Sequence, residues 1–186
     1  MSKNRFSKAW IHQHINDPYV QLARAEGMRS RAAYKLLQVN EKDKLLKPGM
    51  VVVDLGATPG GWSQVSAREV FKGGNKAGKV VAIDLLPMEP LHGVTFIHDD
   101  FSTDQGLAAV ENALAGAKAD LVLSDMAPNI SGIALADQMR LVGLVEMALE
   151  FAAKHLKPQG IFLVKIFHGT GFDGFVKSMQ IGRAHV

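Results

Sequence analysis

The 186-residue chain contains no cysteine, so it has neither a disulfide framework nor a thiolate metal site, which fits a reducing compartment. None of its apolar runs approaches the roughly 20 residues that a membrane-spanning helix needs. The segment from Met1 to Trp10 is polar and basic and contains no apolar core, so it does not resemble a signal peptide. From these absences we expect a cytoplasmic protein that does not contact a membrane.

Apolar residues make up 47% of the sequence, which is enough for one domain with a sizeable core. After residue 50, apolar runs alternate with segments of helical periodicity, and this alternation predicts an α/β fold with a doubly wound, mostly parallel sheet. The predicted strands lie at 51–55, 79–85, 94–98, 120–124 and 160–167. The predicted helices lie at 61–72, 103–116 and 135–156, and the last stops at Lys157-Pro158-Gln159-Gly160.

The net charge is only +3, but basic residues are concentrated near the start of the chain, with aromatic residues between them. The basic residues are Lys3, Arg5, Lys8, Arg24, Arg29, Arg31 and Lys35, and the aromatic ones are Phe6, Trp10, Tyr19 and Tyr34. Such a segment is typical of contact with a nucleic-acid backbone and its bases, although charge alone fits a solvated helix equally well. Asp17 and Ser30 predict the N-caps of two helices, the second running to about Asn40 with Lys35 at the edge of its apolar face.

The strand at 51–55 is followed by the turn Gly56-Ala57-Thr58-Pro59-Gly60-Gly61. Glycines here allow a sharp turn and leave room for a ligand against the main chain and the next helix N-terminus. A dinucleotide-binding turn would read G-x-G-x-x-G, but Thr58 replaces its second glycine, and the Gly-Lys-Ser or Gly-Lys-Thr of a P-loop is absent. The turn therefore favours a ligand that has a ribose and no phosphate, such as S-adenosylmethionine, over the NAD of an oxidoreductase.

Charged residues stand at the ends of all the predicted strands. Four strands finish in acids, and the fifth carries a lysine near its end: Asp54, Asp84, Asp99-Asp100, Asp125 and Lys165. One such residue is commonly a strand reaching solvent, but ligands of open α/β sheets bind beyond the carboxyl ends of the strands. The set as a whole predicts a binding site there, with Asp84 accepting hydrogen bonds from ribose hydroxyls.

Several of these segments together resemble one family. They are Arg29-Ser30-Arg31-Ala32-Ala33-Tyr34-Lys35-Leu36, Asp54-Leu55-Gly56-Ala57-Thr58-Pro59-Gly60-Gly61-Trp62-Ser63-Gln64, Asp84-Leu85-Leu86-Pro87-Met88, Ser124-Asp125-Met126-Ala127-Pro128-Asn129 and Val164-Lys165-Ile166-Phe167. The sequence is similar in these motifs to the FtsJ (RrmJ) family of ribosomal RNA 2′-O-methyltransferases. The similarity covers nearly the whole chain, to about residue 180, and implies a Rossmann-like methyltransferase fold.

The resemblance also implies a site and a substrate. Three members of the family's Lys-Asp-Lys-Glu catalytic set match this sequence, at Lys35, Asp125 and Lys165. The implied cofactor is S-adenosyl-L-methionine, without a metal, and its contacts fall on Gly60, Trp62, Asp84, Asp100 and Asp125. We take Asp100 over Asp99 as the partner of the adenine amino group because Asp100 directly precedes Phe101. The implied substrate is ribosomal RNA, with a uridine of the large subunit as target and a monomeric enzyme.

The implied chemistry centres on one proton. A ribose 2′-hydroxyl is a poor nucleophile until it loses its proton, whereas the methyl group is already activated by the cofactor. A lysine can accept that proton only when desolvation or another cation lowers its pKa. Lys165 lies in an apolar run, which would desolvate its amine, and Lys35 could supply the nearby cation. Asp125 would orient the Lys165 amine, but its negative charge would act against the lowering of the lysine pKa.

The last part of the sequence departs from the family. We expect a basic, helical, RNA-facing extension at 1–45, a methyltransferase core at 46–180 and a non-native tail at 181–186. The family's catalytic glutamate and last two strands have no counterpart, so the chain resembles a C-terminally truncated member. Truncation would leave the strand at 160–167 as an open apolar edge that favours self-association. A fragment that binds RNA and cofactor without catalysis is therefore the alternative to an active enzyme.

Overall fold

The computed structural model describes residues 17–126, 132 and 134–166 of the chain. The helices are α2 (Pro18–Ala25), α3 (Ala32–Asp43), α4 (Gly61–Val70), the short 3₁₀ helix η1 (Lys72–Gly74), α5 (Asp104–Leu114) and α6 (Ala134–His155). The strands are β1 (Val51–Leu55), β2 (Lys79–Asp84), β3 (Val94–His98), β4 (Ala119–Ser124) and β5 (Leu156–Val164). From β1 onward strands and helices alternate as the hydrophobic periodicity predicts, except that β3 follows β2 with no helix between them.

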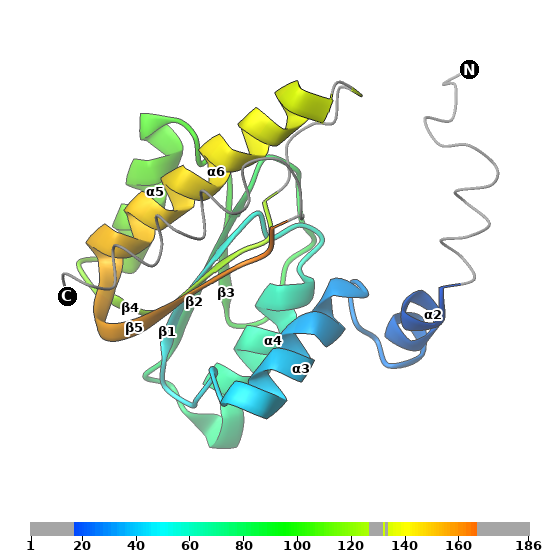
Figure 1. Cartoon of the computed structure of the whole chain (residues 1–186). Helices are drawn as coiled ribbons and strands as arrows, with labels where there is room; N and C mark the ends of the chain where they lie inside the picture. Colours follow the sequence, from blue (N-terminus) through cyan, green and yellow to red (C-terminus); the bar gives the residue numbers. More distant parts are fainter. Residues whose placement is uncertain (1–16, 127–131, 133, 167–186) are drawn as a thin grey trace.

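The five strands form one sheet in the order β3-β2-β1-β4-β5, and every pairing is parallel. The chain moves outward from β1 in one direction and then in the other, so the doubly wound α/β prediction is confirmed (Figure 1). Because all strands run the same way, their carboxyl ends meet at one edge of the sheet. The point where the strand order reverses lies between β1 and β4, where ligands of such sheets bind.

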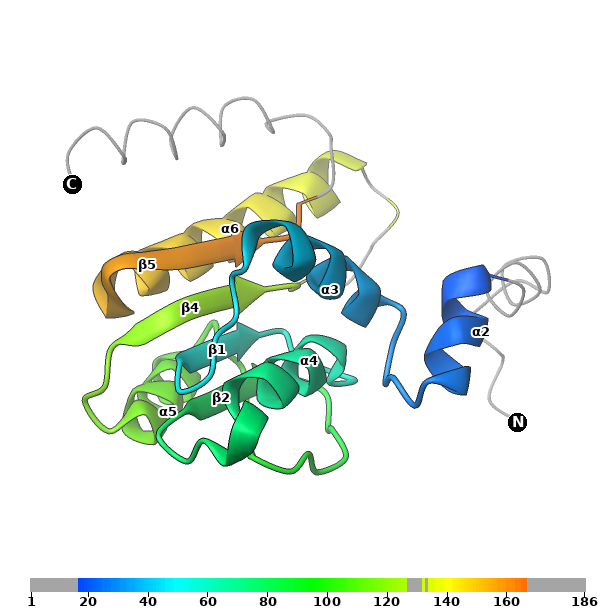
Figure 2. The same cartoon turned by 90° about the horizontal axis from the view of Figure 1, so that it is seen from below.

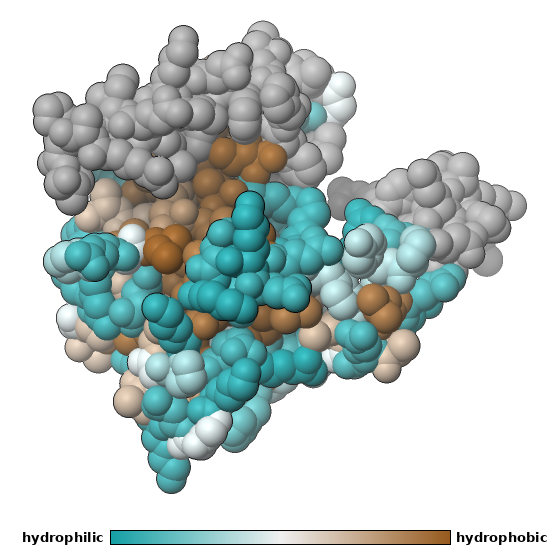
Figure 3. Space-filling model, turned by 60° about the horizontal axis from the view of Figure 1, so that its bottom comes forward, coloured by the Kyte–Doolittle hydropathy of each residue, from teal (hydrophilic) through white to brown (hydrophobic). Residues whose placement is uncertain are grey.

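Helices cover both faces of the sheet (Figures 1 and 2). Alternate residues of each strand point to opposite faces, so Val52 packs toward α3 and α4 while Val53 packs toward α5 and α6. The core on the α3 and α4 side includes Ala33, Leu36, Trp62, Val65, Leu121 and Leu123. The core on the α5 and α6 side includes Val81, Val110, Leu114, Val122, Ala148 and Phe151. On the face shown in Figure 3, apolar surface gathers in the middle, with polar surface around it.

The boundary between α6 and β5 differs from the prediction. The stop signal at 157–160 was expected to separate them, but α6 ends at His155 and β5 begins at Leu156. Leu156 pairs with Ala119 and Ile161 pairs with Leu121, so the turn-forming residues lie within an irregular stretch of β5. Pro158 has no N–H to donate, and an edge strand tolerates it because one side of its ladder is not paired within the described sheet.

The two helices before the sheet begin differently. Asp17 caps α2 as predicted, because its carboxylate accepts from the Tyr19 N–H at 2.9 Å. Ser30 does not cap α3, since that helix begins at Ala32 and its N-cap Arg31 makes no side-chain capping bond. The Ser30 hydroxyl packs against Gly61 instead, so it lies between the α2–α3 connection and the start of α4. None of the described helices is long and apolar enough to cross a membrane.

Candidate functional site

Three pockets adjoin one another at the carboxyl edge of the sheet. The acidic pocket, about 250 Å³, lies beyond β1, β2 and β4 and is lined by Gly56, Asp84, Asp99, Asp100, Phe101, Asp125 and Met126, among others. The arginine pocket, about 470 Å³, lies between the glycine turn and the α2–α3 connection and includes Arg29, Asp54, Trp62 and Asp125. The tyrosine pocket, about 480 Å³, includes Tyr19, Tyr34, Lys35 and Lys165. Asp125 lines the first two pockets and forms an ion pair with Lys165 of the third.

Asp84 is held in a fixed orientation at the end of β2. Its Oδ2 accepts from the Thr58 N–H and its Oδ1 accepts from the Leu86 N–H, each at 2.8 Å. Thr58 also donates its hydroxyl to the Leu86 carbonyl, which ties the glycine turn to the segment after β2. A carboxylate has about four acceptor sites, so the Asp84 oxygens retain capacity toward the acidic pocket. Its predicted bond to ribose hydroxyls stays a prediction.

The neighbouring acids Asp99 and Asp100 have different partners. Asp99 accepts from the Asp100 N–H through Oδ1 and from the Gln105 amide through Oδ2. Asp100 uses only Oδ1, which accepts from the N–H and hydroxyl of Ser102. Within the described residues no donor reaches Oδ2 of Asp100, whereas each oxygen of Asp99 already accepts one hydrogen bond, so Asp100 has the more open carboxylate for a ligand. A Cβ at Gly106 would overlap the Asp100 carbonyl, and sequence reasoning missed this constraint.

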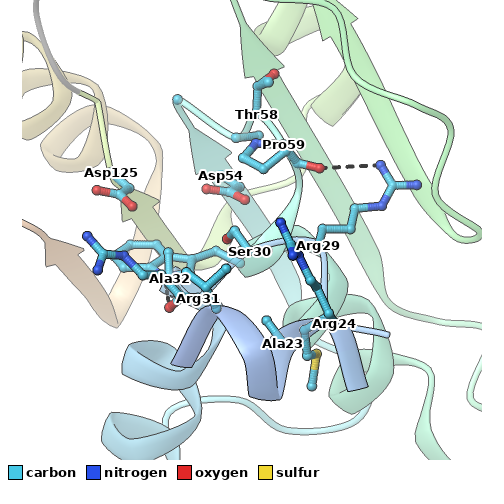
Figure 4. A pocket seen from close by; sticks show the side chains of 16 residues that line it. Ala23, Arg24, Arg29, Ser30, Arg31, Ala32, Asp54, Thr58, Pro59 and Asp125 are labelled. Atoms are coloured by element: carbon cyan, nitrogen blue, oxygen red, sulfur yellow. Dashed lines mark hydrogen bonds between the residues drawn. The ribbon is translucent and has the colours of Figure 1, made fainter. Parts of the chain in front are cut away.

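Asp54 is the most strongly perturbed group at this edge. It is fully buried, and its Oδ2 accepts from the Ser63 hydroxyl at 2.6 Å. Its Oδ1 is buried and has no hydrogen-bond partner within the described part of the chain. Burial raises the pKa of Asp54 to about 7; the Ser63 hydrogen bond opposes this shift, and the charges of Asp125 and Asp84 reinforce it. Figure 4 shows Asp54 and Asp125 together beside the arginine pocket.

The glycines of the turn are packed against protein. A Cβ at Gly56 would come within 2.7 Å of Met126 Cγ, and one at Gly60 would come within 2.8 Å of Met88 Sδ. A Cβ at Gly61 would overlap the Ser30 hydroxyl. Protein therefore fills the space on the side of the missing side chains, while Gly56 and Gly61 line the pockets, so the expected contact of a ligand with the main chain of this turn stays a prediction. Gly60 also has a φ of +105°, which a residue with a Cβ rarely adopts.

Trp62 lies in the core as well as at the pocket wall. Its side chain is 5% exposed and packs with Ala33 and Leu36 of α3. Its indole N–H donates to the Ala32 carbonyl at 2.9 Å. These contacts hold α3 against α4 and account for the burial of Trp62. Its predicted contact with a cofactor stays a prediction.

Two of the three predicted catalytic residues, Lys35 and Lys165, line the tyrosine pocket, and the third, Asp125, pairs with Lys165. Lys165 lies just beyond β5, where its N–H donates to the Ser124 carbonyl at 2.9 Å. Its ammonium group forms an ion pair with Asp125, and both side chains are partly buried. Lys35 projects from the exposed side of α3 and lines the same pocket as Lys165. The structure therefore places these residues on α3 and just beyond the ends of β4 and β5, at one edge of the sheet. The described residues contain no cluster suited to a metal ion.

Arg29 has a role that the sequence did not indicate. Its Nη1 and Nη2 donate to the carbonyls of Glu89 and Pro90, at 2.5 and 2.7 Å. Nη1 also lies 3.4 Å from the Pro59 carbonyl in the glycine turn, the contact drawn in Figure 4. The Arg29 N–H donates to the Gln64 side chain of α4. The sequence places Arg29 among the basic residues expected to contact nucleic acid, but its guanidinium joins the glycine turn to the segment that contains Glu89 and Pro90.

Comparison with known proteins identifies the family. Residues 28–186 match the FtsJ-like methyltransferase family. The chain belongs to that family. Ribosomal RNA large subunit methyltransferase E of Azoarcus sp. (strain BH72) is 58% identical over 180 residues, which are 97% of this chain and 86% of that protein. The protein of the same name from Dechloromonas aromatica (strain RCB) is 57% identical with the same coverage.

A solved structure gives the same result for the fold. A Plasmodium falciparum protein assigned as a ribosomal RNA methyltransferase superposes with a TM-score of 0.73 and 27% identity. The match covers 82% of this chain and 85% of that one. The resemblance seen in the motifs and the Rossmann-like methyltransferase fold are thus both confirmed. In this FtsJ-like chain the acidic, arginine and tyrosine pockets occupy the edge where the motifs meet.

Replacing Arg29 with lysine is expected to weaken the binding of S-adenosylmethionine by up to about tenfold, the limit reached if binding must replace the about 1.5 kcal/mol by which one charge-assisted hydrogen bond holds the glycine turn in place. Lysine keeps the charge but lacks the planar fork that reaches two carbonyls together. Calorimetric titration measures the affinity. Arg68→Lys is the matched control, since Arg68 is an exposed arginine of α4 outside the three pockets. Equal affinity in the two variants would show that the Arg29 fork does not maintain the site.

Proposed function

We propose that this chain transfers a methyl group from S-adenosylmethionine to a ribose 2′-hydroxyl of ribosomal RNA, with a uridine of the large subunit as target. The observation that carries the proposal is the arrangement of Asp125 and Lys165. Their ion pair lies between the acidic pocket, where Asp84 and Asp100 are, and the tyrosine pocket, where Lys35 is. A cofactor on one side of this pair and a hydroxyl group on the other would have their reacting atoms beside it.

The residues around the acidic pocket suit a cationic adenosine ligand. Asp84 would hold the ribose and Asp100 the adenine amino group, and Asp54 of the adjoining arginine pocket would hold the ammonium of the methionine portion. The buried Asp54 Oδ1, which has no donor among the described residues, fits a ligand that brings an N–H group. Bound here, S-adenosylmethionine supplies a methyl group that is already activated by its sulfonium charge. NAD fits less well, because its pyrophosphate would face this cluster of acids.

The proton of the hydroxyl is the remaining requirement. Lys165 would accept it as a neutral amine, and the ammonium so formed is the group that Asp125 holds in position through their ion pair. Lys35 lines the same pocket and brings a second positive charge to it. Proton transfer by a positioned side chain contributes about 10²–10⁴-fold to a rate.

The nature of the acceptor is supported by the relatives. Those at 57–58% identity are named ribosomal RNA large subunit methyltransferase E. At the RNA-facing side, the pocket that contains Lys35 and Lys165 also presents two tyrosine rings and Arg31. Cationic and aromatic groups together suit an RNA backbone and its bases. The proposal therefore takes large-subunit ribosomal RNA as substrate.

The decisive experiment combines transfer and position. The purified chain is incubated with radiolabelled S-adenosylmethionine and unmethylated large ribosomal subunits or their RNA. Label is expected in a dinucleotide that resists alkaline hydrolysis, because a 2′-O-methyl group removes the nucleophile needed for cleavage. Label that is released with mononucleotides would indicate base methylation and contradict the proposal. Binding of cofactor and RNA without transfer would favour a non-catalytic binding protein, and binding of NAD alone would exclude the assigned cofactor.

A further inference from the structure

The tyrosine pocket contains more than its two lysines. Tyr19 of α2, Tyr34 and Gln38 of α3 and Lys165 beyond β5 line it together. Figure 1 shows α2 on the carboxyl-end side of the sheet, separated from β5 by α3. Tyr19 is 48% exposed, which is high for a large aromatic side chain. The proposed catalytic chemistry uses the lysines of this pocket and does not say what each tyrosine contacts.

The two tyrosine rings are held in a defined arrangement. Their centroids are 5.8 Å apart and their planes are inclined by 46°. The Tyr34 hydroxyl donates to a carboxylate oxygen of Glu26 at 2.8 Å, which fixes Tyr34 across the end of α2. Tyr19 packs against this anchored ring and keeps nearly half of its surface exposed. An anchored pair with one exposed member has the form of a stacking surface.

The charges near the rings indicate what would stack on them. Lys35 and Lys165 line the same pocket, and Arg31 contributes a guanidinium that pairs with Asp17. A nucleotide has this combination of features in complementary form, since a flat base is joined to a ribose and an anionic phosphate. Base stacking on an aromatic side chain contributes about 1–3 kcal/mol and depends little on sequence.

We infer that Tyr19, backed by Tyr34, is a stacking surface for an unpaired RNA base next to the ribose that lies at Lys165. The inference rests on the proposed function and names the form of RNA that the site accepts. A base inside a duplex has both faces covered by its neighbours, so it cannot stack on a side chain. RNA-binding proteins that stack bases on aromatic rings act on unpaired or extruded nucleotides. The accepted substrate is therefore an unpaired nucleotide in a loop or at a distorted position.

The test separates base from backbone. Binding of the full chain to a single-stranded oligouridylate is compared with binding to an abasic ribose-phosphate oligomer of the same length, by fluorescence anisotropy. Tyr19→Leu keeps an apolar contact with Tyr34 and removes the aromatic face, so it is expected to weaken oligouridylate binding by about 5- to 150-fold. Binding of the abasic oligomer is expected to be unchanged. Tyr19→Phe, which keeps the ring, is expected to bind both oligomers as the parent chain does.

Two controls distinguish stacking from a structural effect. Leu22→Ala changes another exposed apolar residue of α2 that lies outside the three pockets, and it is expected to alter neither affinity. The affinity for S-adenosylmethionine is expected to stay the same in all variants. Equal weakening of both oligomers by Tyr19→Leu, or a parent chain that binds the abasic oligomer as tightly as oligouridylate, would overturn the inference. Because the comparison measures binding alone, it is independent of the methylation assay that tests the proposed function.

Discussion

The Lys165→Met variant is expected to transfer methyl groups about 10²–10⁴-fold more slowly than the parent chain, because it lacks the proposed proton acceptor. Methionine is similar in length and apolar, so the packing of the Lys165 stem is retained while its amine is lost. The affinity for S-adenosylmethionine is not expected to fall, since Asp84, Asp100 and Asp54 are unchanged. Single-turnover transfer to unmethylated large subunits gives the rate, and calorimetric titration gives the affinity.

Lys157→Met is the matched control for this experiment. Lys157 lies at the opposite end of β5 and forms an ion pair with Asp120, so its loss also removes a lysine-aspartate pair from the same strand. A normal transfer rate is expected, because this pair is remote from the carboxyl edge. If Lys165→Met and Lys157→Met transferred at the same rate, Lys165 would be excluded as the base.

The second large effect concerns Asp54 and the pH dependence of stability. The pKa of Asp54 is about 7 in the folded chain against 3.8 as its ordinary value. Between these values the folded chain retains a proton that the unfolded chain has lost, so stability falls as the pH rises through this window. At 1.36 kcal/mol per pKa unit, the loss reaches about 4 kcal/mol above the upper pKa. Asp54→Asn cannot ionise, so its stability relative to the parent is expected to increase with pH across the window.

Urea unfolding at a series of pH values measures this difference. Glu111→Gln is a comparison variant for which the expected pH dependence of stability has the opposite sign. The hydrogen bond from Lys154 lowers the pKa of Glu111 below its ordinary 4.5, so the stability contributed by Glu111 is present above that value and is lost as the pH falls. A difference between Asp54→Asn and the parent that is constant from pH 4 to pH 7 would show that Asp54 is ionised throughout this range.

Local patterns predicted the elements of the core well. Alternation of apolar runs and helical segments placed β1 through β4 within a residue or so of their observed ends. The strand-end acids lie at one sheet edge because parallel strands leave no other arrangement. The same periodicity misplaced the start of β5, since Pro158 and Gly160 are turn residues in isolation but lie between Leu156 and Ile161, which both pair with β4. Pairing between distant segments overrode the local signal there.

Other features depend on contacts that no spacing in the sequence reveals. Arg29 was indistinguishable from its basic neighbours until its bonds to the Glu89 and Pro90 carbonyls were seen, across about 60 residues of chain. Ser30 is a residue type that often caps helices, but its hydroxyl lies where a side chain at position 61 would be, and this contact exists only in the folded chain. Asp54 was one of several strand-end acids, and its burial sets it apart from the others. Burial and long-range partners are properties of the fold, so they became known only with it.

Asp125 lies where the three pockets meet, so its substitution would affect more than one binding event. Asp125 lines the acidic and arginine pockets and pairs with Lys165 of the tyrosine pocket. The same carboxylate would therefore lie beside both proposed substrates, S-adenosylmethionine and RNA. A substitution at Asp125 would change the Michaelis constants for cofactor and RNA together, along with the rate of transfer. The kinetics of such a variant would not show whether cofactor binding or RNA binding is impaired. Variants of Asp100 on one side and Tyr19 on the other each touch a single pocket, so these two positions can separate the two binding events.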